Sequence, residues 1–225
     1  FDPATGALAR LRDRDCGVRL LASPGIRGVV LEDRSDTWSH GVTRYDEPAG
    51  VFAGQGVRIV EHGPVRTIFR SFGRFEGSSL QMDTVLYPDL PFIDLVLVVD
   101  WRERHRILKL SVPTHVSAGT VTCDTAYGAV ERESDGEEHP VQQWVDLSGA
   151  IGETDYGVAV INDSRYGFDV RDGDIRTSLL RGAPYAWHDP AELHPDGSYP
   201  YQDQGEHVFR FRLFPHRGDW RTSDR

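Results

Sequence analysis

The chain has 225 residues, of which 39% are hydrophobic and 27% are charged. This composition is typical of a soluble globular protein and too apolar for a disordered chain. The formal net charge of −10 argues against broad contact with nucleic acids or anionic membranes. The sequence also lacks the run of about 18 apolar residues that a membrane span requires. A chain of this length can bury one large core, so we expect a single domain over residues 1–225.

The cysteines and the start of the chain suggest a compartment and a source. Cys16 and Cys123 lie far apart and make no disulfide framework at this length. We favour free thiols in a cytoplasmic protein, with a disulfide left open as the alternative. The first residues show neither an initiator Met nor a signal peptide, so we expect an excised fragment. Lys109 is the only lysine, and we interpret this preference for arginine as the composition of a GC-rich bacterial genome.

A loop rich in rings follows the first predicted strand. Residues 29–31 are apolar, and residues 33–45 then place Trp38, His40 and Tyr45 among carboxylates. Proteins hold sugars with aromatic rings against the apolar faces and with polar side chains on the hydroxyls. We therefore predict that Trp38, His40 and Tyr45 border a saccharide pocket or an interface. The structural alternative is that Trp38 plugs the end of a sandwich and His40 caps a turn.

Later segments predict strands with different surroundings. Phe209, Phe211 and Leu213 alternate with Val208, Arg210 and Arg212, which is the period of a strand with one buried face. Residues 93–99 are apolar at nearly every position, which predicts a central strand covered on both faces. The Asp-Gly pair at 172–173 lies between two strand-like segments and predicts a tight hairpin.

These patterns together predict the fold class. Apolar residues nowhere recur at helical spacing over more than two turns, and Gly, Pro and Asp punctuate one strand-like segment after another. We therefore predict an all-β protein, built as a large antiparallel sandwich of two layers.

Two polar clusters are better explained by structure than by chemistry. Asn162, Asp163, Arg165 and Tyr166 suit a turn that bonds its own backbone. Arg165 or Arg181 is also a candidate for an ion pair with a buried carboxylate.

The second cluster lies in a Pro-rich loop over residues 184–200 and contains His188, Asp189, Glu192 and His194. Zinc requires three or four converging ligands, and a polar surface loop explains this group more simply. We assign no metal site. We also assign no catalytic pair, because the Asp and Glu residues lie mostly in turns and no spacing singles out two that face a substrate.

Ordered sequence blocks suggest a family. The blocks stand at residues 1–8, 61–66, 91–113, 127–132, 143–148, 156–167, 177–181 and 203–216. Examples are Glu-His-Gly-Pro-Val-Arg at 61–66 and Tyr-Gly-Val-Ala-Val-Ile-Asn-Asp at 156–163. Each block is weak alone, but their order over nearly the whole chain resembles the C-terminal β-domain of the glycoside hydrolase family 38 α-mannosidases.

The resemblance implies a fold and a role. It implies a sandwich of the galactose-mutarotase-like type, attached to an enzyme that cleaves terminal α-mannosides with retention and with the aid of zinc. By resemblance, the catalytic residues and the zinc belong to an N-terminal domain absent from this chain, so we expect this segment to be inactive alone. Its expected partners are its own catalytic domain, which it braces, and mannose-containing glycans, for which it lines part of the cleft. An apolar, aromatic-rich patch is then expected on its surface.

Two other functions remain open. A free-standing carbohydrate-binding module would use Trp38, Tyr45 and Trp187 for stacking. A mutarotase-like enzyme would need a histidine acid and a glutamate base facing each other across a concave sheet, which a shared fold alone does not grant.

Overall fold

The computed structural model describes residues 1–185 and 197–223, and strands account for all of their regular secondary structure. The strands are β1 (Arg27–Glu32), β2 (Pro48–Val51), β3 (Ala53–His62), β4 (Thr67–Phe75), β5 (Ser78–Leu86), β6 (Ile93–Trp101), β7 (Arg106–Pro113), β8 (Ser117–Thr125), β9 (Gly128–Arg132), β10 (His139–Pro140), β11 (Trp144–Ile151), β12 (Thr154–Asn162), β13 (Gly167–Arg171), β14 (Asp174–Arg181) and β15 (Gly205–Arg217). Over these described residues, no helix has the length and hydropathy needed to cross a bilayer.

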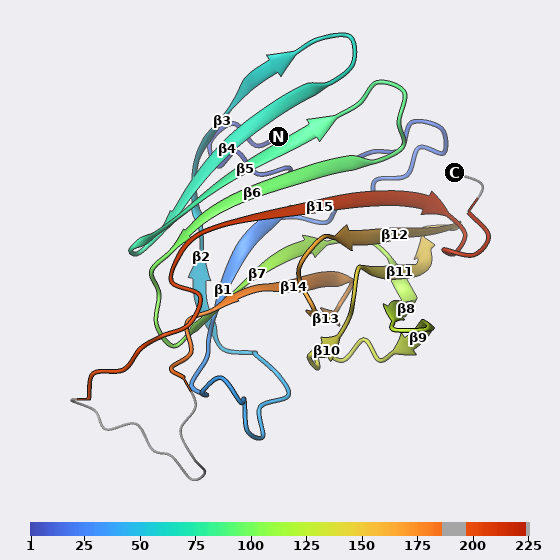
Figure 1. The fold of residues 1–225 in the computed structure, drawn as a ribbon. Coiled ribbons are helices and arrows are strands. Elements are labelled where there is room, and N and C mark those ends of the chain that lie inside the picture. The colour runs from blue at the N-terminus through green and yellow to red at the C-terminus, as the bar shows by residue number, and fades with distance from the viewer. Residues whose placement is uncertain (186–196, 224–225) are drawn as a thin grey trace.

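The strands form two antiparallel sheets. One has nine strands in the order β3-β4-β5-β6-β15-β12-β11-β8-β9, and the other has six in the order β10-β13-β14-β7-β1-β2. Figure 1 shows the larger sheet as a broad curved layer and the smaller sheet alongside it. The prediction of an all-β antiparallel sandwich with two layers is confirmed.

The core fills the space between the sheets. Phe209, Phe211 and Leu213 of β15 are all buried, which confirms the alternation expected there. They belong to one continuous cluster with Leu97 of β6 and Leu110 of β7, from the larger and the smaller sheet respectively. Each such side chain contributes about 1.5–3 kcal/mol by leaving water, so this contact holds the two layers together.

Strand β6 departs from its prediction in one respect. It lies inside the larger sheet, between β5 and β15, as the apolar run indicated. Leu95, Leu97 and Val99 face the core and are fully buried, but Val96 and Val98 on the other face are only half-buried. The expectation of cover on both faces is therefore wrong for this chain, because the smaller sheet covers only the inner face of the larger one.

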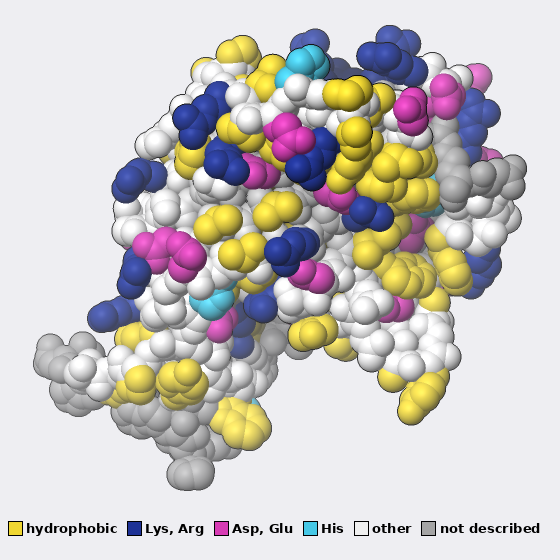
Figure 2. Space-filling model, turned by 45° about the horizontal axis from the view of Figure 1, so that its top comes forward, with side chains coloured by type: hydrophobic (Ala, Val, Ile, Leu, Met, Phe, Trp, Pro, Cys, Tyr) yellow, Lys and Arg dark blue, Asp and Glu magenta, His cyan; other side chains and the backbone are white. Residues whose placement is uncertain are grey.

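The outer face around β6 carries apolar side chains among ion pairs. The strand register runs from Phe72 through Gln81 and Val98 to Val208. Phe72 is 37% exposed and Val208 is 47% exposed. Beside this row, the Arg70 guanidinium binds the Asp83 carboxylate at 2.6 Å. Figure 2 likewise shows hydrophobic side chains interspersed with basic and acidic ones, so the exposed apolar surface is mixed rather than continuous.

Several turns form as the sequence indicates. Asp172 and Gly173 both have positive φ, 51° and 79°, and join β13 to β14 in the predicted hairpin. The side-chain oxygen of Asn162 accepts hydrogen bonds from the backbone N–H groups of Ser164 and Arg165, which makes the predicted self-bonded turn. The two cysteines, Cys16 and Cys123, form no disulfide with each other and are free thiols, as expected.

Candidate functional site

The ring-rich loop 33–47 is tied to strand β14 by one arginine. The Nε of Arg181 donates to Asp33 Oδ2 at 2.7 Å, and its Nη2 donates to Ser35 Oγ at 2.8 Å and to the Asp36 carbonyl at 2.9 Å. Asp33 is 1% exposed. Burial lowers the pKa of Arg181, but the hydrogen bond to Asp33 and the charges of Asp33 and Glu138 act together against it, and the pKa is raised. Of the two arginines considered for a pair with a buried carboxylate, Arg181 forms one, and this pair fixes the start of the loop.

Arg165, the other candidate for such a pair, has a different partner. Its Nη1 donates to the Leu179 carbonyl at 2.7 Å, and its guanidinium lies 4.8 Å from the ring centroid of Phe209. It therefore links the 162–167 turn to β14 without a carboxylate.

A buried charge cluster lies beneath the loop, on the outer face of the smaller sheet. Lys109 of β7 is fully buried, and its ammonium donates to the carboxylates of Glu138 and Asp169. Arg176 binds the other oxygen of Asp169 at 2.6 Å, and Ser178 donates to Glu138. Two cations and two carboxylates thus balance one another, as buried charges must to be tolerated.

These elements surround a cleft of about 780 Å³, which we call the Tyr45 cleft. It lies between loop 33–47, strand β10, the 162–167 turn and the end of β14. Its lining includes the side chains of Trp38, Tyr45, Glu138, Arg165, Tyr166 and Arg181. Its volume is in the range of small-molecule sites.

The structure brings two of the three predicted sugar-binding residues to this cleft. Trp38 lines it and is 69% exposed, so the indole does not plug the end of the sandwich. Tyr45 also lines it, but is only 6% exposed. His40 is absent from the lining and stacks on Trp38, with ring centroids 6.2 Å apart and planes within 6°. Tyr166, 66% exposed, adds a second exposed ring to the lining, beside that of Trp38.

Tyr45 connects the cleft to the buried charges. Its ring centroid lies 5.5 Å from Lys109 Nζ and 5.6 Å from the Arg181 guanidinium carbon. Its hydroxyl lies 3.4 Å from Ser39 Oγ. Burial raises the pKa of Tyr45, so the phenol stays neutral near pH 7 and can both donate and accept a hydrogen bond.

The cleft offers the groups that a polyol requires. Glu138 presents a carboxylate, Tyr45 and Ser178 present hydroxyls, and Trp38 and Tyr166 present accessible rings. Sequence reasoning missed Glu138, Ser178 and Lys109. A signal for Lys109 existed, because a lone lysine between leucines in an apolar strand must find buried carboxylates.

Other chemistry considered from the sequence finds less support in the described residues. A histidine and a carboxylate meet where His216 Nε2 lies 2.6 Å from Asp146 Oδ2, but both side chains are at most 1% exposed and cannot reach a substrate. Over residues 1–185 and 197–223, no three His, Cys, Asp or Glu side chains gather as metal ligands. Trp187 and the cluster His188, Asp189, Glu192 and His194 lie outside the described residues.

The comparisons with known proteins agree on one family. Residues 1–197 match the model of the glycosyl hydrolases family 38 C-terminal domain. α-Mannosidase G of Dictyostelium discoideum is 27% identical over 217 residues, which cover 89% of this chain and 18% of that protein. Human α-mannosidase 2C1 is 32% identical over 155 residues, which cover 65% of this chain and 13% of that protein. The chain therefore spans less than a fifth of the length of these curated relatives.

Solved structures show the same fold. The crystal structure of an α-mannosidase from Enterococcus faecalis superposes with a TM-score of 0.70 at 14% identity, covering 93% of this chain and 27% of that one. A glycosyl hydrolase family 38 protein from the same organism gives a TM-score of 0.71 at 14% identity, with 93% and 28% covered. The order of motifs, the two-layer sandwich and the match over residues 1–197 lead to one conclusion: the chain belongs to the glycosyl hydrolase family 38 C-terminal domains.

Proposed function

We propose that this chain is the accessory β-domain of a retaining, zinc-dependent α-mannosidase, in which it braces the catalytic domain and lines part of the sugar cleft. The observation that carries the proposal is the family match over residues 1–197. The names of the curated relatives support α-mannoside hydrolysis as the activity of the longer protein. We assign the catalytic carboxylates and the zinc to that protein's catalytic domain, and we place it in the bacterial cytoplasm, in keeping with free Cys16 and Cys123.

Within this proposal, the Tyr45 cleft is the part of the chain that meets the mannoside. Trp38 offers an exposed ring for the apolar face of a sugar, and Glu138 offers a carboxylate for its hydroxyls. The Arg181–Asp33 pair holds the loop that carries Trp38. Lys109 and Ser178 hold Glu138, so both groups are positioned before a ligand arrives.

The outer face of β6 is the proposed contact with the catalytic domain. Val96 and Val98 are half-buried, and Phe72 and Val208 are exposed beside them. The apolar run of β6 is typical of a strand covered on both faces, and this chain covers only one. A neighbouring domain would supply the missing cover.

Hydrolysis of 4-nitrophenyl α-mannoside with added zinc tests the activity. We expect turnover by the gene product that contains this sequence and none by residues 1–225 alone. Trp38→Ala in the gene product should lower kcat/KM by about two- to tenfold, which is the size of one ring contact. Tyr127→Ala removes a fully exposed ring from the β8–β9 hairpin and should leave kcat/KM unchanged. Turnover by residues 1–225 alone would refute the proposal.

Thermal melting of two protein forms tests the contact. Val208→Glu should lower the Tm of the gene product, because an added carboxylate would be buried in the proposed contact. It should leave the Tm of residues 1–225 unchanged, because Val208 is exposed there. Tyr127→Glu serves as the control in both forms. Equal Tm shifts in the two forms would exclude this face as the contact.

Binding by residues 1–225 alone would favour the carbohydrate-binding module instead. The exposed rings of Trp38 and Tyr166 beside one cleft are the observation in favour of that second function. Saturable binding of mannotriose without any partner domain, lost in Trp38→Ala, would support it.

A further inference from the structure

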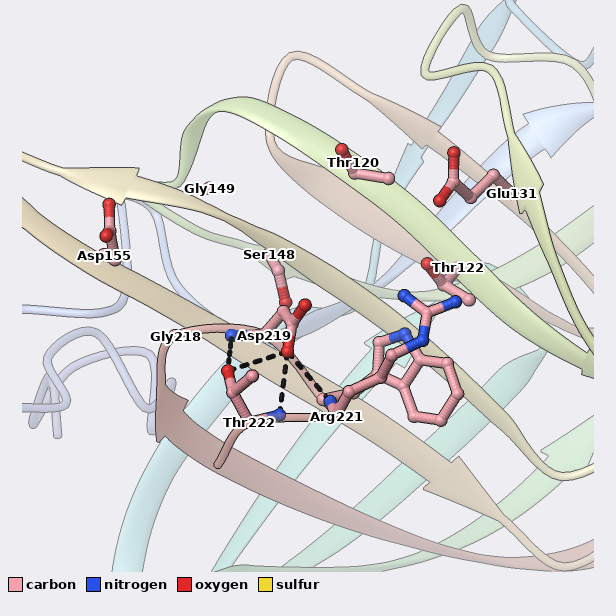
Figure 3. Close-up of a pocket in the computed structure, with 11 residues that line it drawn as sticks. Thr120, Thr122, Glu131, Ser148, Gly149, Asp155, Gly218, Asp219, Arg221 and Thr222 are labelled. Carbon is pink, nitrogen blue, oxygen red and sulfur yellow. Dashed lines mark hydrogen bonds between the residues drawn. The ribbon is translucent and has the colours of Figure 1, made fainter. Parts of the chain in front are cut away.

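A second hollow lies on the other sheet and shares no lining residue with the Tyr45 cleft. It has a volume of about 380 Å³ and is bounded by strands β8, β9 and β11, the start of β12 and the 218–222 loop. Figure 3 shows this C-terminal pocket and the side chains that border it. They include Thr122, Glu131, Ser148, Asp155, Asp219 and Arg221.

The 218–222 loop is a compact turn that holds itself in shape. Asp219 Oδ1 accepts hydrogen bonds from the backbone N–H of Arg221 at 3.0 Å, from the N–H of Thr222 at 2.8 Å and from the Thr222 hydroxyl at 2.8 Å. The bonds from Thr222 are the main reason that the pKa of Asp219 is lowered. The carboxylate of Asp219 is therefore occupied by its own loop, which leaves Arg221 as the group that this loop offers to a ligand.

Arg221 is fixed by an aromatic stack rather than by a carboxylate. Its guanidinium carbon lies 4.4 Å from the ring centroid of Trp220, which packs on Trp144 with ring centroids 5.1 Å apart. In Figure 3 the Arg221 side chain extends from the loop toward the strands that carry Thr122 and Glu131. No described side chain forms an ion pair within 4.0 Å with Arg221, Glu131 or Asp155. The pocket thus keeps one cation and two carboxylates apart, each with hydrogen-bonding capacity to spare.

The floor of the pocket rests on a buried polar network. Ser148 lines the pocket and donates its hydroxyl hydrogen to Asp146. Asp146 is fully buried and also meets His216 Nε2 at 2.6 Å. Because its hydrogen is committed to Asp146, Ser148 is fixed as an acceptor toward the pocket.

The charges decide which kind of ligand fits. An anion would be repelled by Glu131, Asp155 and Asp219, and a cation would leave the hydrogen-bond donors of Arg221 without an acceptor. The described residues also gather no three side chains as ligands for a metal ion. A neutral molecule whose hydroxyls both donate and accept satisfies Arg221 as a donor and Glu131 and Asp155 as acceptors. We propose that the C-terminal pocket is a second saccharide site, which binds one hexopyranose unit. The site is on a different sheet from the Tyr45 cleft, so it does not depend on the proposed function.

Titration of isotope-labelled residues 1–225 with methyl α-mannopyranoside, followed by two-dimensional NMR, tests the proposal. We expect saturable shifts of the indole N–H of Trp220 and of the Thr122 and Arg221 amides. Arg221→Gln and Glu131→Gln each remove one charged hydrogen-bonding group from an exposed position and should raise Kd by about tenfold. Arg66→Gln, which removes an exposed guanidinium outside the pocket lining, should leave this Kd unchanged.

Three outcomes would overturn the assignment. One is the absence of saturable shifts at the C-terminal pocket, and another is a Kd that neither Arg221→Gln nor Glu131→Gln changes. The third is a stronger response of the same amides to inorganic phosphate than to the mannoside, which would make the pocket an anion site. Saturable shifts at Trp38 alone would support the Tyr45 cleft and reject the C-terminal pocket, so the two proposals fail separately.

Discussion

The buried lysine gives the sharpest stability prediction. Lys109 is fully buried and is shared by Glu138 and Asp169. Lys109→Met keeps the volume but leaves two carboxylates without their common cation. Breaking a buried pair in this way costs about 3–5 kcal/mol. We expect about 3 kcal/mol, the lower end, because Asp169 retains Arg176 at 2.6 Å and the side chain of Glu138 is 22% exposed and thus partly solvated.

Thermal unfolding, monitored by circular dichroism, measures this loss. A loss of about 3 kcal/mol corresponds to a fall in Tm of about 6–12 °C for a domain of this size. Lys109→Met/Glu138→Gln should recover at least half of that fall, because Asp169 and Arg176 then balance each other and the new amide at position 138 keeps a partner in Ser178. The reasoning is refuted if the single variant melts within about 2 °C of the parent, or if the double variant melts no higher than the single one. Arg66→Met, which breaks an exposed pair with Glu61, is the control and should leave the Tm unchanged.

Three further variants test separate features. Desolvation raises the pKa of Asp174 to about 6, so the folded state favours its neutral form: its contribution to stability is present below about pH 4 and is lost as the pH rises through 6. As the pH rises from 4 to 6, Asp174→Asn should therefore become more stable relative to the parent, by about 3 kcal/mol at most. Urea unfolding at several pH values measures this, and a difference in unfolding free energy that does not change with pH would contradict it. Gly173→Ala should lower the unfolding free energy by about 1–2 kcal/mol, because φ is +79° and the added carbon would meet the Thr114 and Val116 carbonyls at 3.0 Å; an unchanged urea midpoint would count against it. Phe209→Ala should cost about 3–5 kcal/mol through the cavity it leaves between the sheets, and a loss below about 1 kcal/mol would mean that the core collapses around it.

Local patterns predicted the parts of the fold that local chemistry determines. The alternation at Phe209 and Phe211 fixes which face of β15 is buried, because strand side chains point to opposite faces in turn. The Asp172-Gly173 turn was equally readable, since few other pairs adopt two positive φ values in succession. The burial of the second face of β6 could not be predicted in this way, because it depends on what packs outside the sheet rather than on the strand itself.

The candidate site was only partly predictable for a related reason. The rings of Trp38 and Tyr45 stand out in the sequence, but nothing local shows that one is exposed and the other buried. Glu138 and Asp169 lie 29 and 60 residues from Lys109, so their meeting follows from the order of strands in the smaller sheet. The strand order alone brings these charges together, so neither composition nor sequence spacing could have predicted the cluster.

The position of β15 has a consequence for how the chain acquires its structure. This strand, at residues 205–217, pairs with β6 on one side and β12 on the other, and so joins two halves of the larger sheet. During synthesis on the ribosome, β3–β6 and β8–β12 emerge first and each must wait with an open edge. Such edges invite pairing between chains, and long-range strand pairing is slow. A chain ended at residue 197, where the family match stops, would lack the joining strand, and we expect it to aggregate rather than to fold as a shorter domain.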